Sequence, residues 1–188
     1  MRKTILTFGL ISGAVSGLML VVTILFISAI GFDRAEVLGY ATIVLSFLLV
    51  YAGIRSYRDN IGGGVITFGR AFTVGILITL ISCLCYVAVW EVLYFKVGSM
   101  RQFMSQYSAH MADQVRASGA NQQAIEAQLR EIARYKELYD NPLFNSAITF
   151  LEPFPIGLII TFLSAAILRK NKMAVSPNTV GPGVRKTD

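Results

Sequence analysis

The chain has 188 residues, of which 54% are hydrophobic, and its mean hydropathy is +0.59. This composition excludes an ordinary soluble domain, because the apolar residues are grouped into runs long enough to span a bilayer. The net charge of +6 would suit a nucleic-acid-binding protein, but the excess Lys and Arg residues flank the apolar runs, where the positive-inside rule explains them. We therefore expect an all-α membrane protein that lies in the lipid bilayer and does not bind nucleic acid.

The first apolar run covers residues 4–30 and follows a short basic start. It is longer than the apolar core of a signal peptide, so it predicts a retained transmembrane helix whose N-terminus is cytoplasmic. Gly9, Gly13 and Gly17 recur at every fourth position, which puts them on one helix face. This stripe of small residues predicts a close contact with another helix, either in the same chain or in a second copy.

A short, slightly acidic turn is expected at residues 31–36, followed by the second span at residues 37–54. The arginine-rich loop at residues 57–70 comes next. Such a loop between two spans is a strong orientation signal, and it predicts that this end of the protein is cytoplasmic. Arg58 and Asp59 in the loop are candidate functional residues that would pair at the cytoplasmic mouth. Topology and a tight turn explain both residues equally well.

The third predicted span covers residues 68–95, and the fourth covers residues 143–168 and ends in basic residues. Between them, residues 98–141 are polar and carry two apolar stripes of helical period, which predicts a helical hairpin. Alternation of the spans places this hairpin outside the cytoplasm. We expect residues 1–172 to form one four-helix transmembrane domain and residues 173–188 to form a disordered cytoplasmic tail.

Several motifs in these segments carry a resemblance to a known family. They are the Gly-rich first span, Gly53-Ile54-Arg55-Ser56-Tyr57-Arg58-Asp59-Asn60 with Thr67-Phe68-Gly69, Tyr139-x-Asn141-Pro142, and Glu152-Pro153-Phe154-Pro155-Ile156-Gly157. The chain resembles a bacterial family of small four-span membrane proteins that is catalogued as a domain of unknown function. The resemblance implies four spans in the bacterial cytoplasmic (inner) membrane, and it implies no activity, substrate or catalytic residue.

Glu152 is the main candidate for a functional residue. Residue counting places it inside the outer leaflet of the fourth span, directly before Pro153 and near Pro155. Prolines free backbone carbonyls, and a carboxyl beside such carbonyls in a broken helix is typical of proton and ion sites. The alternative, which the position of the proline favours, is that Glu152 caps the start of a shorter span. Lys96 is a possible cationic partner.

Glu91 is the second candidate carboxyl, and it is expected near the outer membrane interface. An interfacial carboxylate needs no function, although Glu91 and Glu152 reach a similar depth and would be able to face each other. Trp90, Tyr94 and Phe95 beside it predict an interfacial aromatic belt.

The functional expectations follow from these features and from what the sequence lacks. It shows no Ser-His-Asp, Cys-His or metal-binding constellation and has one histidine, so we expect no enzyme, no metal and no cofactor. An accessory or scaffold protein that binds a protein partner or a second copy of itself needs only the packing stripes and the hairpin. The alternative is a small proton- or ion-coupled transporter or channel that uses Glu152 in the proline-broken fourth helix.

Overall fold

The computed structural model describes residues 1–170, and this part of the chain is almost entirely helical. Four apolar segments are long enough to cross a membrane. They are α1 (Arg2–Ile30), α2 (Phe32–Asn60), α3 (Phe68–Lys96) and the consecutive pair α6 (Pro142–Leu151) and α7 (Phe154–Leu168). The expected all-α fold of a four-span membrane protein is therefore confirmed.

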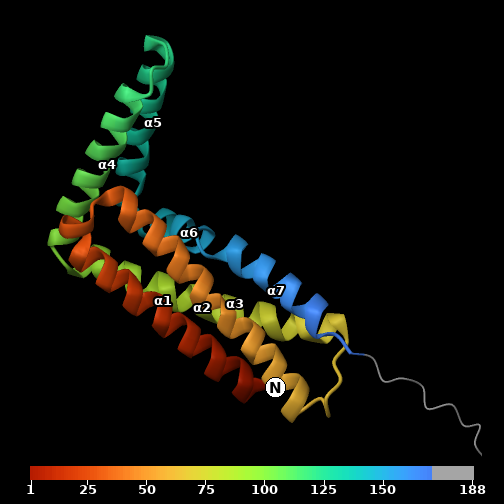
Figure 1. Cartoon of the computed structure of the whole chain (residues 1–188). Coiled ribbons are helices and arrows are strands. Elements are labelled where there is room, and N and C mark those ends of the chain that lie inside the picture. Colours follow the sequence, from red (N-terminus) through yellow and green to blue (C-terminus); the bar gives the residue numbers. More distant parts are fainter. Residues whose placement is uncertain (171–188) are drawn as a thin grey trace, which may run out of the picture.

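The two remaining helices, α4 (Ser99–Ala117) and α5 (Gln122–Leu138), lie side by side and project from the body formed by the spans (Figure 1). Their location outside the cytoplasm stays a prediction, because the structure contains no membrane. The tail expected at residues 173–188 lies outside the described residues.

The boundaries of α2 differ from those expected. The turn expected at residues 31–36 is reduced to Gly31, whose φ of 81° is accessible to glycine without strain and lets the chain reverse within one residue. Acidic residues suggested a turn, but they are also favourable in the first turn of a helix, near the positive end of its dipole. At its other end α2 continues to Asn60, so Arg58 and Asp59 lie in the last helical turn and not in a loop.

The centre of the body is the contact between α2 and α3, with α1 packed against both and α7 packed against both from another side. Phe47, Val50 and Ile54 of α2 meet Val74 and Ile78 of α3, and all five side chains are fully buried. Between membrane helices, apolar burial alone contributes little, because lipid is as apolar as the side chains. Small residues and hydrogen bonds therefore decide which helices come close.

Buried hydroxyl groups join the spans to one another. The Ser12 hydroxyl donates to the Ser46 carbonyl at 2.9 Å and lies 3.0 Å from the Ser82 hydroxyl, so it links α1 to α2 and α3. The Thr79 and Thr161 hydroxyls lie 2.9 Å apart and link α3 to α7. These short side chains satisfy one another while allowing the helix backbones to approach.

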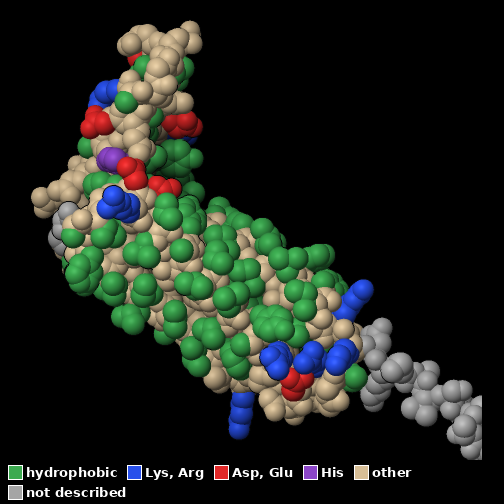
Figure 2. Space-filling model, viewed as in Figure 1, with side chains coloured by type: hydrophobic (Ala, Val, Ile, Leu, Met, Phe, Trp, Pro, Cys, Tyr) green, Lys and Arg blue, Asp and Glu red, His purple; other side chains and the backbone are tan. Residues whose placement is uncertain are grey.

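One end of the body collects positive charge. The loop after α2 turns through Gly63 and Gly64, at φ values of 61° and 81°, and Ile66 then exchanges two backbone hydrogen bonds with Lys170 after α7. The basic residues at this end are Arg2, Lys3, Arg55, Arg58, Arg70, Arg169 and Lys170. Figure 2 shows blue side chains gathered at this end and apolar side chains covering the body between it and the projecting helices.

Candidate functional site

The fourth span is broken in its middle, at Glu152 and Pro153. α6 ends at Leu151, and Glu152 is its C-cap, with its N–H donating to the Ile148 carbonyl at 3.2 Å. Pro153 and Pro155 have no N–H, so the helical hydrogen bonds that these two positions would donate are missing. The break separates α6 from α7 and gives Glu152 a position at a helix end, as expected of a proline-broken span.

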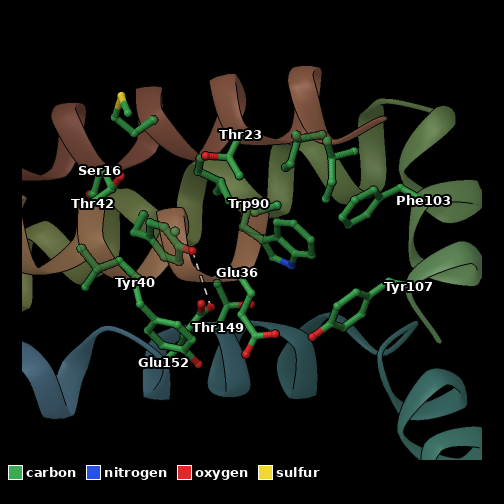
Figure 3. A pocket seen from close by; sticks show the side chains of 18 of the residues that line it. Ser16, Thr23, Glu36, Tyr40, Thr42, Trp90, Phe103, Tyr107, Thr149 and Glu152 are labelled. Carbon is green, nitrogen blue, oxygen red and sulfur yellow. Dashed lines mark hydrogen bonds between the residues drawn. The ribbon is translucent and has the colours of Figure 1, made fainter. Parts of the chain in front are cut away.

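A cavity of about 530 Å³ lies beside this break, between α1, α2, α3 and α6 and next to the first turns of α4 (Figure 3). Its volume is in the range of small-molecule sites. The polar side chains in its wall include Thr23, Glu36, Tyr40, Tyr86, Tyr107 and Glu152. The cavity lies toward the end of the body from which α4 and α5 project.

Glu152 opens onto this cavity and has one hydrogen-bond partner. The Tyr86 hydroxyl donates to the Glu152 carboxylate at 3.5 Å, which is long for a hydrogen bond between two oxygens. Among the described side chains, no ion pair includes Glu152, and Lys96 does not reach it. Glu152, the candidate for a functional carboxyl in a broken helix, lines a cavity at the break. It stands at the end of α6, whereas the alternative expected it to cap the start of a shorter span.

Glu36 is a second carboxylate in the same cavity, and sequence reasoning missed it. It lies one helical turn before Tyr40 on α2, and both line the cavity. Tyr107 of α4 points toward Glu36 (Figure 3). Burial raises the pKa of the Tyr107 phenol above its usual range, and the negative charge of Glu36 raises it further, so the phenol keeps its proton.

Thr23 of α1 contributes a hydroxyl group that the protein does not satisfy. The residue is 8% exposed and lines the cavity, and its oxygen has no hydrogen-bond partner among the described atoms. Buried hydroxyls nearly always have a partner in native proteins. Thr23 is therefore an exception that requires an explanation.

Glu91 does not line the cavity, and its carboxylate takes part in a contact between α3 and α6. It accepts a hydrogen bond of 2.7 Å from the Ser146 hydroxyl of α6. The Trp90 indole beside it donates to the Asn145 side-chain oxygen at 2.7 Å. Trp90 and Tyr94 are only 8% and 4% exposed, so the expectation that they form an interfacial aromatic belt with Phe95 does not hold for these two residues. The Trp90 N–H has its acceptor, Asn145, in α6, and the Tyr94 O–H has its acceptor, Asp140, in the turn before α6.

Arg58 and Asp59 lie at the basic end of the body, at the far end of the spans from Glu152. The Arg58 guanidinium donates to the Asp59 carboxylate at 2.7 Å, and Arg55 lies 3.6 Å from the same carboxylate. The Asp59 side chain is 43% exposed, and ion pairs open to solvent contribute little to stability. The structure therefore does not bring Arg58 and Asp59 together with Glu152.

The glycine stripe of α1 faces α3 of the same chain. A Cβ atom at Gly9 would lie 2.8 Å from the Ile81 Cβ, and one at Gly17 would lie 2.9 Å from a Val89 methyl group. A Cβ at Gly13 would collide with Cys85. Only residues without a side chain fit this contact, and the partner helix is internal.

Comparison with known proteins identifies a family but no characterised relative. The model of a family described as a protein of unknown function (DUF4199) matches residues 7–170. The resemblance to a family catalogued as a domain of unknown function is thereby confirmed. No curated protein and no solved structure matches the chain.

Proposed function

We propose that this chain, which belongs to a family of proteins of unknown function (DUF4199), is a membrane-embedded accessory protein. In this proposal its projecting helices bind a protein partner. These two helices, α4 and α5, are called the arm below. The observation that carries the proposal is that the arm is firmly braced at its base and stands clear of the body beyond it (Figure 1). An accessory role requires no catalytic group.

The first brace joins the arm to the turn between α1 and α2. Asp33 lies 3.0 Å from the His110 ring and accepts a hydrogen bond of 2.9 Å from the Gln114 side chain. The Phe32 ring stacks on His110 with 5.2 Å between ring centroids and also contacts Tyr107. Together these contacts fix the direction of α4.

The second brace joins the end of α5 to α3 and α6. The Tyr94 hydroxyl donates to Asp140 at 3.0 Å, and the Asn145 side-chain amide donates to the Tyr139 carbonyl at 3.0 Å. The rings of Tyr94 and Tyr139 pack edge to face, 5.9 Å apart. The arm thus enters and leaves the body through two sets of directional contacts, which is the support that a presented binding surface needs.

Beyond the braces, the arm covers no part of the body. Its inner seam is formed by half-buried residues such as Ile125, Leu129 and Ile132, and no residue of α5 is fully buried. Nearer the base, Tyr135 contacts Phe144 of α6 with 6.1 Å between ring centroids, yet it is 49% exposed and lies among arginines and glutamates. Exposed tyrosine among arginine is typical of protein–protein interfaces. This surface supports a protein as the partner, and a second copy of the chain is one such protein.

The positive-inside rule supports an orientation for this assembly. The basic end would face the cytoplasm, with both termini on that side and the arm outside, in the cytoplasmic (inner) membrane of a bacterium. A transporter role finds no comparable support, because fully buried apolar side chains such as Phe47, Ile54 and Ile78 fill the bundle centre. Glu152 opens onto a cavity that lies toward one end of the spans.

Photo-crosslinking in intact membranes tests the partner. A photoreactive amino acid at Tyr135 should give a discrete adduct that mass spectrometry identifies, and an adduct of twice the mass would identify a second copy. The matched control is the same probe at Leu45, which is 63% exposed on the apolar surface of α2. Absence of any protein adduct at Tyr135, or the same adducts from both positions, would contradict the proposal.

A further inference from the structure

We propose that the cavity binds an organic ammonium ion that carries an apolar body. This goes beyond the partner-binding role of the arm, because the cavity is formed by the spans and the base of α4. The proposal rests on three features of its wall: two carboxylates that pair with no cation among the described side chains, aromatic rings around them, and one buried hydroxyl group without a partner among the described atoms.

The carboxylates come from different helices. Glu36 lies in the first turns of α2 and Glu152 at the end of α6, and Figure 3 shows both among the side chains that surround the space. Neither belongs to any ion pair of the described side chains. Both carboxyl groups are exposed and belong to the wall of one cavity, so their negative charges oppose each other. A cation between them would remove this repulsion.

The aromatic rings suit an organic cation. Tyr40, Tyr86, Tyr107 and Trp90 all line the cavity. The Trp90 N–H is already used by Asn145, so Trp90 offers its ring and not its N–H to a ligand. An ammonium group is attracted to the faces of such rings, most strongly where water is excluded.

Thr23 supplies the independent sign of a missing ligand. Its hydroxyl is buried and unpartnered at the α1 side of the cavity, whereas Ser12 and Thr79 in the same bundle have partners. A ligand hydroxyl or carbonyl near the ammonium group would satisfy it. The neighbouring wall is apolar, with Leu20, Ile24 and Ile148, and would hold the ligand's hydrocarbon part.

Other ligand classes fit less well. A metal ion needs several donors, and no three His, Cys, Asp or Glu side chains gather anywhere in residues 1–170. A phosphate-bearing lipid would bring negative charge to Glu36 and Glu152, and no described Lys or Arg side chain lines the cavity to receive it. The volume of about 530 Å³ suits a molecule of drug size.

The test uses Trp90, which is the only tryptophan in the chain, as a fluorescent reporter inside the cavity. The full chain in neutral-lipid nanodiscs is titrated with a 4-bromobenzyl(dodecyl)dimethylammonium ion, whose bromine, a short-range fluorescence quencher, lies close to the ammonium group. We expect saturable quenching. The control is bromododecanol, which partitions into lipid equally well but carries no charge, and it should give only gradual, unsaturable quenching.

Two variants assign the binding to the carboxylates. Glu36→Gln and Glu152→Gln should each lower the affinity for the ammonium probe about tenfold. The double variant should lose saturable quenching. Glu91→Gln is the matched control, because Glu91 lies outside the cavity and should leave the affinity unchanged. Thermal unfolding of each variant verifies that it is folded, and a misfolded variant is replaced by Glu→Ser at the same position.

A competition experiment distinguishes a water-soluble ligand from one that is dissolved in the membrane. Phenylethyltrimethylammonium, which stays in water, should displace the brominated probe if the natural ligand enters from solution. Displacement only by long-chain ammonium ions would indicate a ligand that enters from the lipid. Equal quenching of the wild type and the double Gln variant, or saturable quenching by the neutral alcohol, would overturn the proposal.

Discussion

Asn145 joins more parts of the bundle by hydrogen bonds than its neighbours in α6, at the end of the spans near the arm. Its side-chain oxygen accepts from Trp90 at 2.7 Å and from Thr149 at 3.3 Å, and its amide group donates to the Tyr139 carbonyl at 3.0 Å. The side chain is fully buried. One amide therefore connects α3, α6 and the end of the arm, and it does so where water is scarce and unpaired polar groups are expensive.

Replacing Asn145 with Ala should lower the free energy of unfolding in detergent by about 1–2 kcal/mol, because the Trp90 N–H loses its acceptor. Unfolding followed by Trp90 fluorescence measures the change directly. The control is Asn60→Ala, since Asn60 is exposed and bonds only to Ser56 on the same helix. Equal stabilities of the two variants would show that the Asn145 contacts contribute nothing.

At the scale of residues, sequence reasoning found Glu152 because two prolines mark it locally as unusual. It missed Glu36 because acidic residues after a glycine were interpreted as a turn, and the α-helical spacing of Glu36 and Tyr40 becomes meaningful only once α2 is known to begin at Phe32. Nothing in the sequence distinguishes Thr23 from other threonines. Its missing partner depends on where α2, α3 and α6 lie around it.

Among the elements, the contact of α1 with α3 depends most on single residues. Gly13→Leu should separate these helices and lower the melting temperature by several degrees, because a side chain at this position would collide with Cys85. Gly69→Leu is the matched control, since nothing lies within 4 Å of a Cβ at that position. If both variants melt alike, the stripe does not mediate a close contact.

The arm should loosen when its first brace is removed. Asp33→Ala deletes the acceptor for His110 and Gln114, so amide hydrogen exchange in α4 should become faster by about tenfold, as expected for the loss of one or two hydrogen bonds. Asp113→Ala is the control, because Asp113 pairs only with Arg116 on the same helix. Unchanged exchange in the Asp33 variant would mean that the Asp33 hydrogen bonds do not hold α4 in place.

The elements themselves were predictable where a physical signal is local. Apolar runs of spanning length predict α1, α2, α3 and the α6–α7 pair, and apolar stripes of helical period predict α4 and α5. Helix ends were less predictable, since α2 extends beyond its apolar run at both ends, from Phe32 to Asn60. The helix that packs against the glycine stripe was not predictable, because small residues indicate only that another helix comes close and not which one.

At the scale of the whole molecule, the two ends of the bundle differ in both charge and shape. Basic side chains gather at the end that carries the N-terminus, the loop after α2 and the end of α7, and the arm stands at the opposite end (Figures 1 and 2). The central claim is that these ends lie on opposite sides of a membrane, with the arm outside. Both the proposed partner and the proposed ligand depend on this arrangement for their access.

Labelling with a membrane-impermeant maleimide tests that claim most directly. Single cysteines are placed at Ser118, in the tip of the arm, and at Gly63, in the loop at the basic end. The native Cys83 and Cys85 lie within α3, inside the bilayer and out of reach of the reagent. In intact cells, Ser118→Cys should be labelled and Gly63→Cys should react only after the membrane is opened. Labelling of Gly63→Cys in intact cells with protection of Ser118→Cys would contradict the account.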